Sequence, residues 1–345
     1  MAPCKRRQQA VDEVESAHNP FLQCAELILP WLTPQELAAV SLTSASLRRA
    51  SLPVALRRSS DASRGLEPLP VPFRNAVDSR PYAYFLYTPS SRVLSPLNDT
   101  LLRQSWGSTR TLARSTAFPG RPSREAVDVV GDVVLGCDCE RCEGHDCACW
   151  GGKGGEEEEA VVTECGAGCG CGAECGNRAS QGGVEVRLKI VRDKKKGWCL
   201  LADQAIDKGR FVCEYAGELL TTKEARARQK EYDELATSRG FSSALLVVRE
   251  HLPSGKACLR INIDATKVGN VGRFINHSCD GGNLSTVLVR STGALLPRLC
   301  FFASKDIQQG EELTFSYGEI RLRSNGLQCC CGASTCLGIL PSEHT

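Results

Sequence analysis

The pattern of apolar and polar residues divides the chain into a helical N-terminal stretch and a long C-terminal stretch of short strands. Residues 20–52 carry apolar stripes at helical spacing with a break at Thr33 and Pro34, which predicts two or three short packed helices. Residues 53–135 are rich in proline, serine and arginine and predict an irregular segment. Its aromatic run at 82–87 is expected to dock on the rest of the protein.

From residue 184 onward the pattern predicts a mainly β domain, because short β-branched and apolar runs alternate with turn residues. One helix is expected over residues 225–235, since Thr221 and Glu224 have the spacing of a capping box. The predicted strands are 184–191, 210–215, 243–248, 260–263, 284–289 and 298–302.

The length and charge of the chain limit its number of domains and the kinds of ligand that it is expected to bind. The 345 residues allow about two domains. The chain has 42 Lys and Arg against 40 Asp and Glu, so the positive and negative charges nearly cancel. A protein without a strong positive field is not expected to have nucleic acid as its main ligand. The first thirty residues lack a secretory signal, and no stretch reaches about 18 apolar residues. We therefore expect an intracellular protein with no membrane partner.

Twenty cysteines are the outstanding feature of the composition. Without a secretion signal they indicate metal sites, and a disulfide-rich knot is the alternative. Nine of them lie in one segment with three Cys-x-Cys pairs, whose members are too close for ordinary disulfide geometry with each other. The predicted ligands in this segment are Cys137, Cys139, Cys142, Cys147, Cys149, Cys165, Cys169, Cys171 and Cys175.

Nine thiolates do not divide evenly among tetrahedral zinc ions, because two sites need eight ligands and three need twelve. Three zinc ions fit if three of the thiolates bridge two metals each. A second cluster closes the chain, where Cys329, Cys331 and Cys336 offer three ligands and Cys279 is the candidate for the fourth. The sequence therefore predicts one further structural zinc, and the nine-cysteine segment should lose its fold without metal.

Five motifs follow one another in order along the chain. They are the nine-cysteine block ending in "CGNR" at 175–178, "EYAGE" at 214–218, "RFINHSC" at 273–279, "ELTFSYGE" at 312–319 and the terminal cysteine triplet. In this order they resemble the pre-SET, SET and post-SET regions of lysine methyltransferases of the suppressor-of-variegation class, and they are most similar to its small plant members. The resemblance covers residues from about 65 to 340.

The resemblance implies a mainly β SET fold, a β-clip whose C-terminal segment threads under a loop, with a cysteine-rich pre-SET region and a short helical N-terminal region. The implied regions are a helical, weakly F-box-like region at 1–60, an irregular linker at 61–135, a pre-SET zinc cluster at 136–182, a SET catalytic domain at 183–320 and a post-SET zinc segment at 325–340.

The resemblance also implies a cofactor, S-adenosylmethionine, which in this family binds on the face opposite the peptide groove. A narrow channel joins the two faces. By motif match, Gly197 and Trp198 line the cofactor, Asn276 and His277 contact its adenosine part, and Arg273 lies nearby.

The same match identifies Tyr317 as the catalytic tyrosine and places Tyr215 in the same channel. Only a neutral lysine amine can attack the methyl group, and at pH 7 about one lysine in 2,500 is neutral, a cost of roughly 4.6 kcal/mol. The sulfonium charge and a dry channel both lower the pKa of the lysine, so no dedicated base is needed. We expect Tyr317 to orient the amine without ionising. In this family the position of Phe315 governs how many methyl groups are added.

Three positions depart from the family pattern. The Asp-Pro-Asn that usually follows the cysteine of "RFINHSC" is replaced by Asp280-Gly281-Gly282-Asn283, an insertion that is expected to loosen this loop. Cys199 stands where the family usually has the second glycine of Gly-Trp-Gly, which leaves cofactor affinity open. The strand at 241–245 lacks a tyrosine that helps to shape the channel, which leaves the substrate open.

The sequence thus predicts a nuclear, chromosome-associated histone-lysine N-methyltransferase acting on a histone tail and on nucleosomes. The family suggests the ninth-position lysine of histone H3. A catalytically weak chromatin-binding protein that retains the fold is the alternative. Residues 21–50 also loosely resemble an F-box, which would dock a Skp-type ubiquitin-ligase adaptor, whereas a helical cap or dimerisation element explains them equally well.

Overall fold

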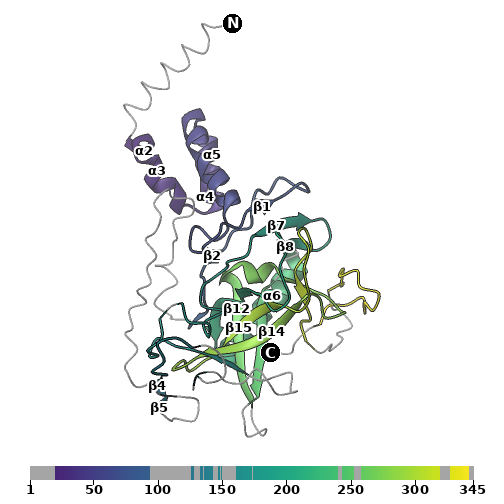
Figure 1. The fold of residues 1–345 in the computed structure, drawn as a ribbon. Helices are drawn as coiled ribbons and strands as arrows, with labels where there is room; N and C mark the ends of the chain where they lie inside the picture. The colour runs from purple at the N-terminus through teal and green to yellow at the C-terminus, as the bar shows by residue number, and fades with distance from the viewer. Residues whose placement is uncertain are drawn as a thin grey trace.

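A β-rich body carries a small group of helices at one end in a computed structural model of the chain (Figure 1). No helix in the described part of the chain is long and apolar enough to cross a membrane. The structure describes residues 20–93, 126–127, 133–134, 136–142, 147, 149, 161–172, 174–239, 243–251, 258–318 and 327–341.

The N-terminal helices form as the apolar stripes predict. They are α2 (Pro20–Gln23), α3 (Ala25–Ile28), the 3-10 helix η1 (Leu29–Trp31), α4 (Pro34–Thr43) and α5 (Ala45–Ser60). The break at Thr33 is confirmed, because its hydroxyl accepts a hydrogen bond from the Glu36 amide while the Glu36 carboxylate accepts one from the Thr33 amide. The expected irregular start at residue 53 is wrong. Helix α5 continues through Pro53, because the burial of Val54 and Arg58 offsets the cost of an internal proline.

Arg58 fixes the helices to the segment that follows them. Its side chain is fully buried, and its Nη2 donates to the carbonyl oxygens of Pro30 at 3.2 Å and Leu32 at 2.6 Å. Its Nη1 donates to the Tyr82 hydroxyl at 3.0 Å, and the guanidinium lies 5.8 Å from the centre of the Tyr82 ring. One buried cation therefore joins three parts of the chain.

The segment after the helices is more ordered than its composition predicts, because it adds short parallel strands to sheets of the body. Strand β1 pairs with β7, β2 with β12 and β3 with β10. The expected docking of the aromatic run is confirmed, since Phe85 and Tyr87 are buried in the main core. The strands are β1 (Phe73–Arg74), β2 (Leu86–Tyr87) and β3 (Arg92–Val93).

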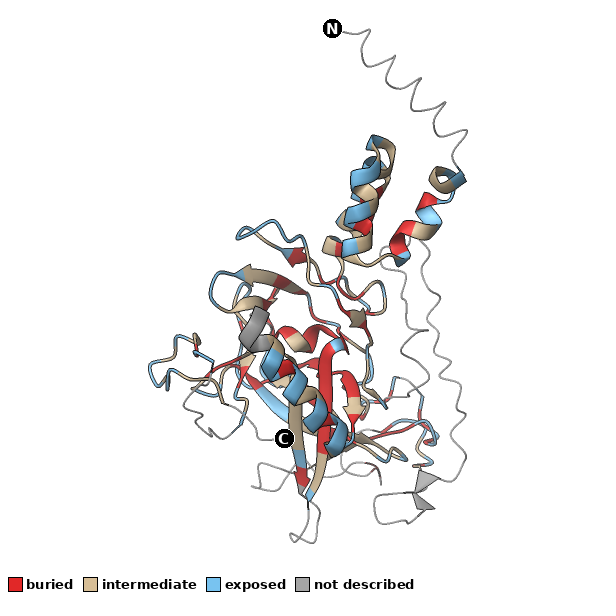
Figure 2. Ribbon diagram, turned by 180° about the vertical axis from the view of Figure 1, so that it is seen from behind, coloured by how far each residue is buried: buried red, intermediate tan, exposed pale blue. Residues whose placement is uncertain are grey.

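The body consists of small sheets with the main core between them, and the predicted mainly β fold class is confirmed (Figure 2). Each of the six predicted strands is present. The sheet orders are β1-β7-β8, β11-β12-β10-β3 with β2 beside β12, β6-β14-β15-β9, β13-β16 and β4-β5. The strands are β4 (Ala126–Val127), β5 (Val133–Val134), β6 (Val162–Glu164), β7 (Leu188–Asp193), β8 (Gly197–Ala202), β9 (Phe211–Glu214), β10 (Gly217–Leu220), β11 (Leu245–His251), β12 (Cys258–Gly269), β13 (Asn276–His277), β14 (Leu284–Ser291), β15 (Arg298–Ala303) and β16 (Thr314–Phe315).

The described residues of the body also form two helices. Helix α6 (Thr222–Arg239) begins at the predicted capping box, in which the Glu224 amide donates to the Thr221 hydroxyl and the Glu224 carboxylate accepts from the Thr221 amide. Most of its described side chains are exposed, as the outer helix in Figure 2 shows. The 3-10 helix η3 (Val271–Phe274) leads directly into β13 and so places the "RFINHSC" motif inside the body.

Candidate active site

The parallel pairing of β13 with β16 brings the "RFINHSC" and "ELTFSYGE" motifs together, with Asn276 opposite Thr314 and His277 opposite Phe315. Tyr317 follows β16 directly, and its amide donates to His277 Nδ1 at 3.2 Å. The candidate catalytic tyrosine therefore lies against a candidate cofactor residue, although about forty residues separate them in the sequence.

Tyr317 is placed to act as a neutral hydrogen-bonding group. Its hydroxyl donates to the carbonyl oxygen of Ile275 at 2.9 Å, which leaves the phenolic lone pairs free to accept. Burial raises the pKa of this phenol above its ordinary value near 10, so it stays protonated at neutral pH. Such a group orients a substrate and does not serve as a base.

An aromatic row extends from Tyr317 into the core. The ring centroids of Tyr317 and Phe315 are 4.9 Å apart, those of Phe315 and Phe301 4.8 Å, and those of Phe301 and Tyr215 6.3 Å. The row joins all three candidate channel residues. Its fourth member, the fully buried Phe301, was missed from the sequence, where it is one of several apolar residues in β15.

The far end of the row meets the segment that departs from the family pattern. The Tyr215 hydroxyl donates to the carbonyl oxygen of Ala244 at 2.7 Å, and the Ala244 amide donates to the Thr266 hydroxyl at 2.9 Å. Burial raises the pKa of Tyr215, so it too remains a neutral donor. Residues 241 and 242 lie outside the described part of the chain.

The candidate cofactor residues of the β7–β8 turn lie beside β13. Gly197 has a φ of 88°, a left-handed conformation that a side chain would strain. The half-buried Trp198 ring has the Arg192 guanidinium 5.4 Å from its centre and Phe73 edge-on at 5.2 Å. The Asn276 amide nitrogen lies 3.4 Å from the Trp198 carbonyl oxygen, so the two motifs form one site.

Arg273 has a different environment from these residues. Its guanidinium lies 4.8 Å from the Phe85 ring centre and 5.2 Å from that of Phe274, and its Nη2 donates to the Thr266 carbonyl oxygen at 3.1 Å. Burial lowers its pKa to about 10. These contacts pack the guanidinium against two aromatic rings and the backbone of β12.

The chemistry of this region fits S-adenosylmethionine. That molecule carries an ammonium group, a carboxylate and a flat purine, and so needs hydrogen-bond acceptors, donors and an apolar surface. The half-buried indole of Trp198 offers the flat surface. Asn276 has its amide nitrogen occupied by protein acceptors, which leaves its Oδ1 as an acceptor for a cationic or amine donor.

His277 connects the site to the terminal cysteines. Its Nδ1 accepts the Tyr317 N–H, so in the neutral ring the proton is on Nε2, which lies 3.2 Å from Cys279 Sγ. Burial lowers the pKa of the imidazole and favours this neutral form. The ring therefore bridges Cys279 and the backbone of Tyr317.

The structure brings the four predicted post-SET ligands together. The Sγ atoms of Cys279, Cys329, Cys331 and Cys336 all lie within 4.8 Å of one another. Cys279 and Cys329 are 3.8 Å apart, close to the separation of about 3.8 Å that two thiolates have on one tetrahedral zinc. This group could hold one metal ion.

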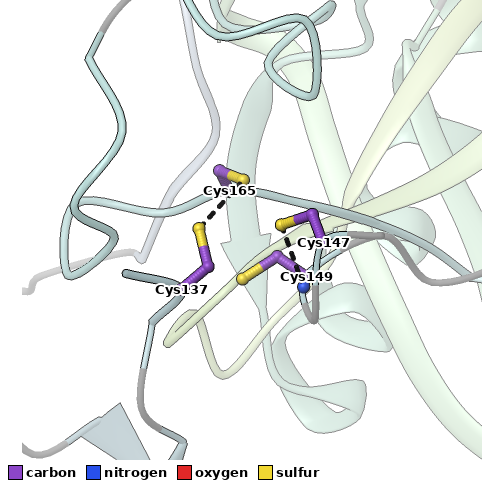
Figure 3. A group of neighbouring side chains, drawn as sticks. All are labelled: Cys137, Cys147, Cys149 and Cys165. Carbon is purple, nitrogen blue, oxygen red and sulfur yellow. Dashed lines mark hydrogen bonds between the residues drawn. The ribbon is translucent and has the colours of Figure 1, made fainter. Parts of the chain in front are cut away.

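The nine pre-SET cysteines also lie together in one cluster, in which all but Cys139 are buried, and every described cysteine is free of a disulfide. Figure 3 shows four of them, Cys137, Cys147, Cys149 and Cys165. Sulfur separations of 3.5 Å for Cys137–Cys142, 3.6 Å for Cys142–Cys165 and 3.9 Å for Cys137–Cys165 match thiolates that share a metal. Three overlapping groups of four could each hold an ion, and Cys137 belongs to all three. Cys169 lies 3.5 Å from Cys149, and Cys175 lies 3.9 Å from Cys165.

The cysteine cluster is joined to the SET body by strand pairing and one buried ion-pair network. Strand β6 pairs in parallel with β14. Arg298 Nη2 lies 3.1 Å from Glu164 Oε2, and its Nη1 lies 3.8 Å from Glu214 Oε2. Gly166 must lack a side chain, because a Cβ there would lie 1.9 Å from the carbonyl oxygen of Thr292.

Comparison with known proteins agrees with this geometry. The SET domain family matches residues 197–318 and the Pre-SET motif family residues 63–178. Histone-lysine N-methyltransferase SUVR3 of Arabidopsis thaliana is 56% identical over 343 residues, covering 96% of this chain and 95% of that protein. Histone-lysine N-methyltransferase SETMAR of Mus musculus is 36% identical over 309 residues, covering 85% and 92%.

Solved structures match as well. The methyltransferase domain of human SETMAR has a TM-score of 0.60 at 29% identity and covers 82% of this chain and 97% of that one. KRYPTONITE in complex with mCHH DNA, an H3(1-15) peptide and SAH has a TM-score of 0.56 at 26% identity, covering 81% and 53%.

Fold, site and matches define an S-adenosylmethionine-dependent protein-lysine N-methyltransferase built on a SET domain. The chain belongs to the SET-domain family of histone-lysine methyltransferases. Within that family it is similar to the Arabidopsis protein SUVR3 over almost the whole length of both chains.

Proposed function

We propose that this protein methylates histone H3 at its ninth-position lysine, on nucleosomes in the nucleus. The observation that carries the reaction is the neutral hydroxyl of the partly buried Tyr317, which donates to the Ile275 carbonyl oxygen at one end of the aromatic row. The substrate is supported by similarity to KRYPTONITE, whose structure contains an H3(1-15) peptide, and to SUV39H2 of Xenopus tropicalis at 32% identity over 243 residues.

The described residues explain how the amine is prepared. S-adenosylmethionine supplies the methyl group from its sulfonium centre. Because the Tyr317 hydroxyl hydrogen is committed to the Ile275 carbonyl, its oxygen accepts an N–H of the lysine and turns the nitrogen lone pair toward the cofactor side. Phe315 and Phe301 exclude water, which lowers the pKa of the lysine and favours its neutral form.

We further propose that the cysteine groups hold zinc, three ions in the pre-SET cluster and one in the post-SET group. Overlapping groups of four support shared thiolates in the first cluster, and the separate group around Cys279 supports a single ion. Both sites would be structural, because all their ligands come from the protein and no open coordination position is needed.

The direct test is an assay of the purified protein with labelled S-adenosylmethionine on separated histones and on nucleosomes. Tyr317→Phe should reduce turnover by about a hundredfold or more while cofactor binding persists, because only the orienting hydroxyl is lost. Tyr84→Phe makes the same change in a partly exposed loop and is the matched control. Near-normal activity in Tyr317→Phe would contradict the proposed role, and an inactive wild type that still binds histone would favour the catalytically weak chromatin-binding alternative.

The number of methyl groups is a separate test at Phe315. This side chain is buried between Phe301 and Tyr317 and places no hydroxyl in the row. Phe315→Tyr should shift the product toward monomethyl-lysine with little change in the first transfer, because the added hydroxyl would hold the amine or a water. Mass spectrometry of an H3 peptide through a time course would show this. A wild type that stalls at one methyl group under excess cofactor contradicts the assignment.

A second candidate function, docking of a Skp-type adaptor, is favoured by the surface of the N-terminal helices. Among the described residues, Leu27, Leu42, Leu52 and Leu56 are 57–75% exposed, and they offer apolar surface on which a partner helix could pack. Purified Skp-type adaptor should bind the full chain with micromolar affinity or better, and Leu42→Glu with Leu52→Glu should abolish binding. Failure of the wild type to bind would leave a helical cap or dimerisation element.

A further inference from the structure

An ion pair joins the β7–β8 turn to the segment that precedes Tyr317. Lys196 Nζ lies 2.6 Å from Glu312 Oε2, and both side chains are about one-fifth exposed. The backbone of Glu312 is held as well, since it bridges to Leu201 of β8 and its carbonyl oxygen accepts from Asn283 Nδ2 at 2.9 Å. The carboxylate therefore has a defined position.

The second oxygen of the same carboxylate reaches the candidate cofactor residue. Glu312 Oε1 accepts a hydrogen bond from Asn276 Nδ2 at 3.0 Å, and the same nitrogen lies 3.2 Å from Cys199 Sγ. Burial raises the pKa of the Cys199 thiol to about 12, so it is a neutral and weak acceptor. Glu312 is accordingly the strongest of the protein acceptors that face this amide nitrogen.

A hydrogen bond that fixes the nitrogen of a side-chain amide also fixes the direction of its oxygen. The nitrogen and oxygen of Asn276 point in opposed directions from the same carbon, so a nitrogen held by Glu312 sets the direction of Oδ1. The carboxylate cannot bond to Oδ1 in place of the nitrogen, because both oxygens are hydrogen-bond acceptors and repel each other. The pair thus selects one of the two amide orientations, which matters because only Oδ1 can accept from a cofactor donor.

We propose that Glu312, held by Lys196, is a positioning residue that orients the Asn276 amide for S-adenosylmethionine. This inference rests on the assignment of Asn276 to the cofactor site. The ion pair would then strengthen cofactor binding. It would not affect the methyl-transfer step, because neither charge lies in the aromatic row that receives the lysine.

Glu312→Gln tests the inference. A glutamine can present its oxygen to Asn276 only by turning its NH₂ group toward the Lys196 ammonium, so either orientation opposes two donors. Affinity for S-adenosylhomocysteine, measured by calorimetry without histone, should fall about tenfold. The KM for S-adenosylmethionine should rise in proportion, and kcat at saturating cofactor should stay within about twofold.

Glu311→Gln is the matched control, because it makes the same change at the preceding residue, whose carboxylate accepts only from the Gln308 amide among the hydrogen bonds of the described residues. Thermal unfolding without cofactor checks that Glu312→Gln folds. Should it not fold, Lys196→Met keeps the acceptor for Asn276 but frees it to move, and should weaken affinity by about threefold, with Lys195→Met unchanged.

Unaltered cofactor affinity in the folded Glu312→Gln variant, or in Lys196→Met, would overturn the inference, as would a fall in kcat with affinity intact. These results are separable from the proposed function. Cofactor binding is measured without histone, so an error about the histone substrate leaves the outcome unchanged, whereas a wild type that binds no cofactor contradicts the assignment of Asn276.

Discussion

The two cysteine groups use the same ligand chemistry but stand in different relations to the reaction. The nine-cysteine cluster is buried and contacts the SET body through β6 and Arg298. The group around Cys279 is partly exposed and reaches Tyr317 through a single imidazole. The first therefore takes the place of a hydrophobic core in a glycine-rich segment, whereas the second supports the active site itself.

Loss of metal should therefore have different consequences at the two cysteine groups. Loss of metal from the first should appear as unfolding of a segment, and loss from the second as lost activity in a folded protein.

The largest effect is expected from Cys137→Ser, because this sulfur belongs to all three possible pre-SET metal groups. Its loss should release most of the pre-SET metal and destabilise the segment by roughly several kcal/mol. Metal analysis and limited proteolysis would measure this. Cys258→Ser, at an exposed cysteine outside both groups, should retain all metal. Retention of full metal content in Cys137→Ser would contradict a shared-ligand cluster.

Cys336→Ser should lose one metal ion and most activity while the pre-SET metal stays bound, because its group is separate from the first. A loss of activity of about tenfold or more is expected, since without the metal the whole terminal segment around Cys329 and Cys331 loses its anchor to Cys279 beside the site. Metal content and turnover are measured on the same sample. Loss of all metal together would show that the two groups are not independent.

Arg298→Met should weaken the junction between the cluster and the body without touching a metal ligand. It leaves the buried carboxylates of Glu164 and Glu214 without this cation, which should cost roughly 3–5 kcal/mol in the free energy of unfolding. Urea unfolding is the measurement. Arg210→Met, which removes an exposed ion pair with Glu185, should cost less than about 1 kcal/mol, and equal costs would refute the importance of burial.

The smallest effect is expected from His277→Phe, which keeps an aromatic ring but removes both of its hydrogen bonds. Turnover should fall by about fivefold, because the Tyr317 backbone loses one anchor, while all metal remains bound. Steady-state kinetics with metal analysis would check both. Loss of the post-SET metal would show that the ring supports the metal site more than the tyrosine.

Sequence patterns predicted β7, β9, β11, β12, β14 and β15, because these strands are apolar runs between turn residues. They missed the strands of two or three residues, since so short a strand shows no periodicity and forms only where a sheet edge is available. They also missed β8 and β10, each of which begins at a glycine, a residue that is depleted in strands. They also ended α5 too early at Pro53, because the burial of Val54 and Arg58 is a tertiary effect.

For the site, the motifs led to Tyr317, Asn276 and the cysteine groups because their residue types and spacing are unusual. Phe301 and the Lys196–Glu312 pair carried no such signal. A phenylalanine in a strand looks like any core residue, and two opposite charges 116 positions apart become partners only when the sheets form.

The buried Arg58 has a consequence for how any partner of the N-terminal helices would act. Because it ties α5 to Tyr82, and the chain just beyond Tyr82 enters the main core, the helices are mounted on the catalytic body and do not swing on a flexible tether. A protein bound to these helices would keep any third protein that it binds in a fixed position relative to the methyl-transfer site. The effective concentration of that third protein at the active site would then depend on the fixed distance and orientation between the helices and the site, and not on the length of a linker.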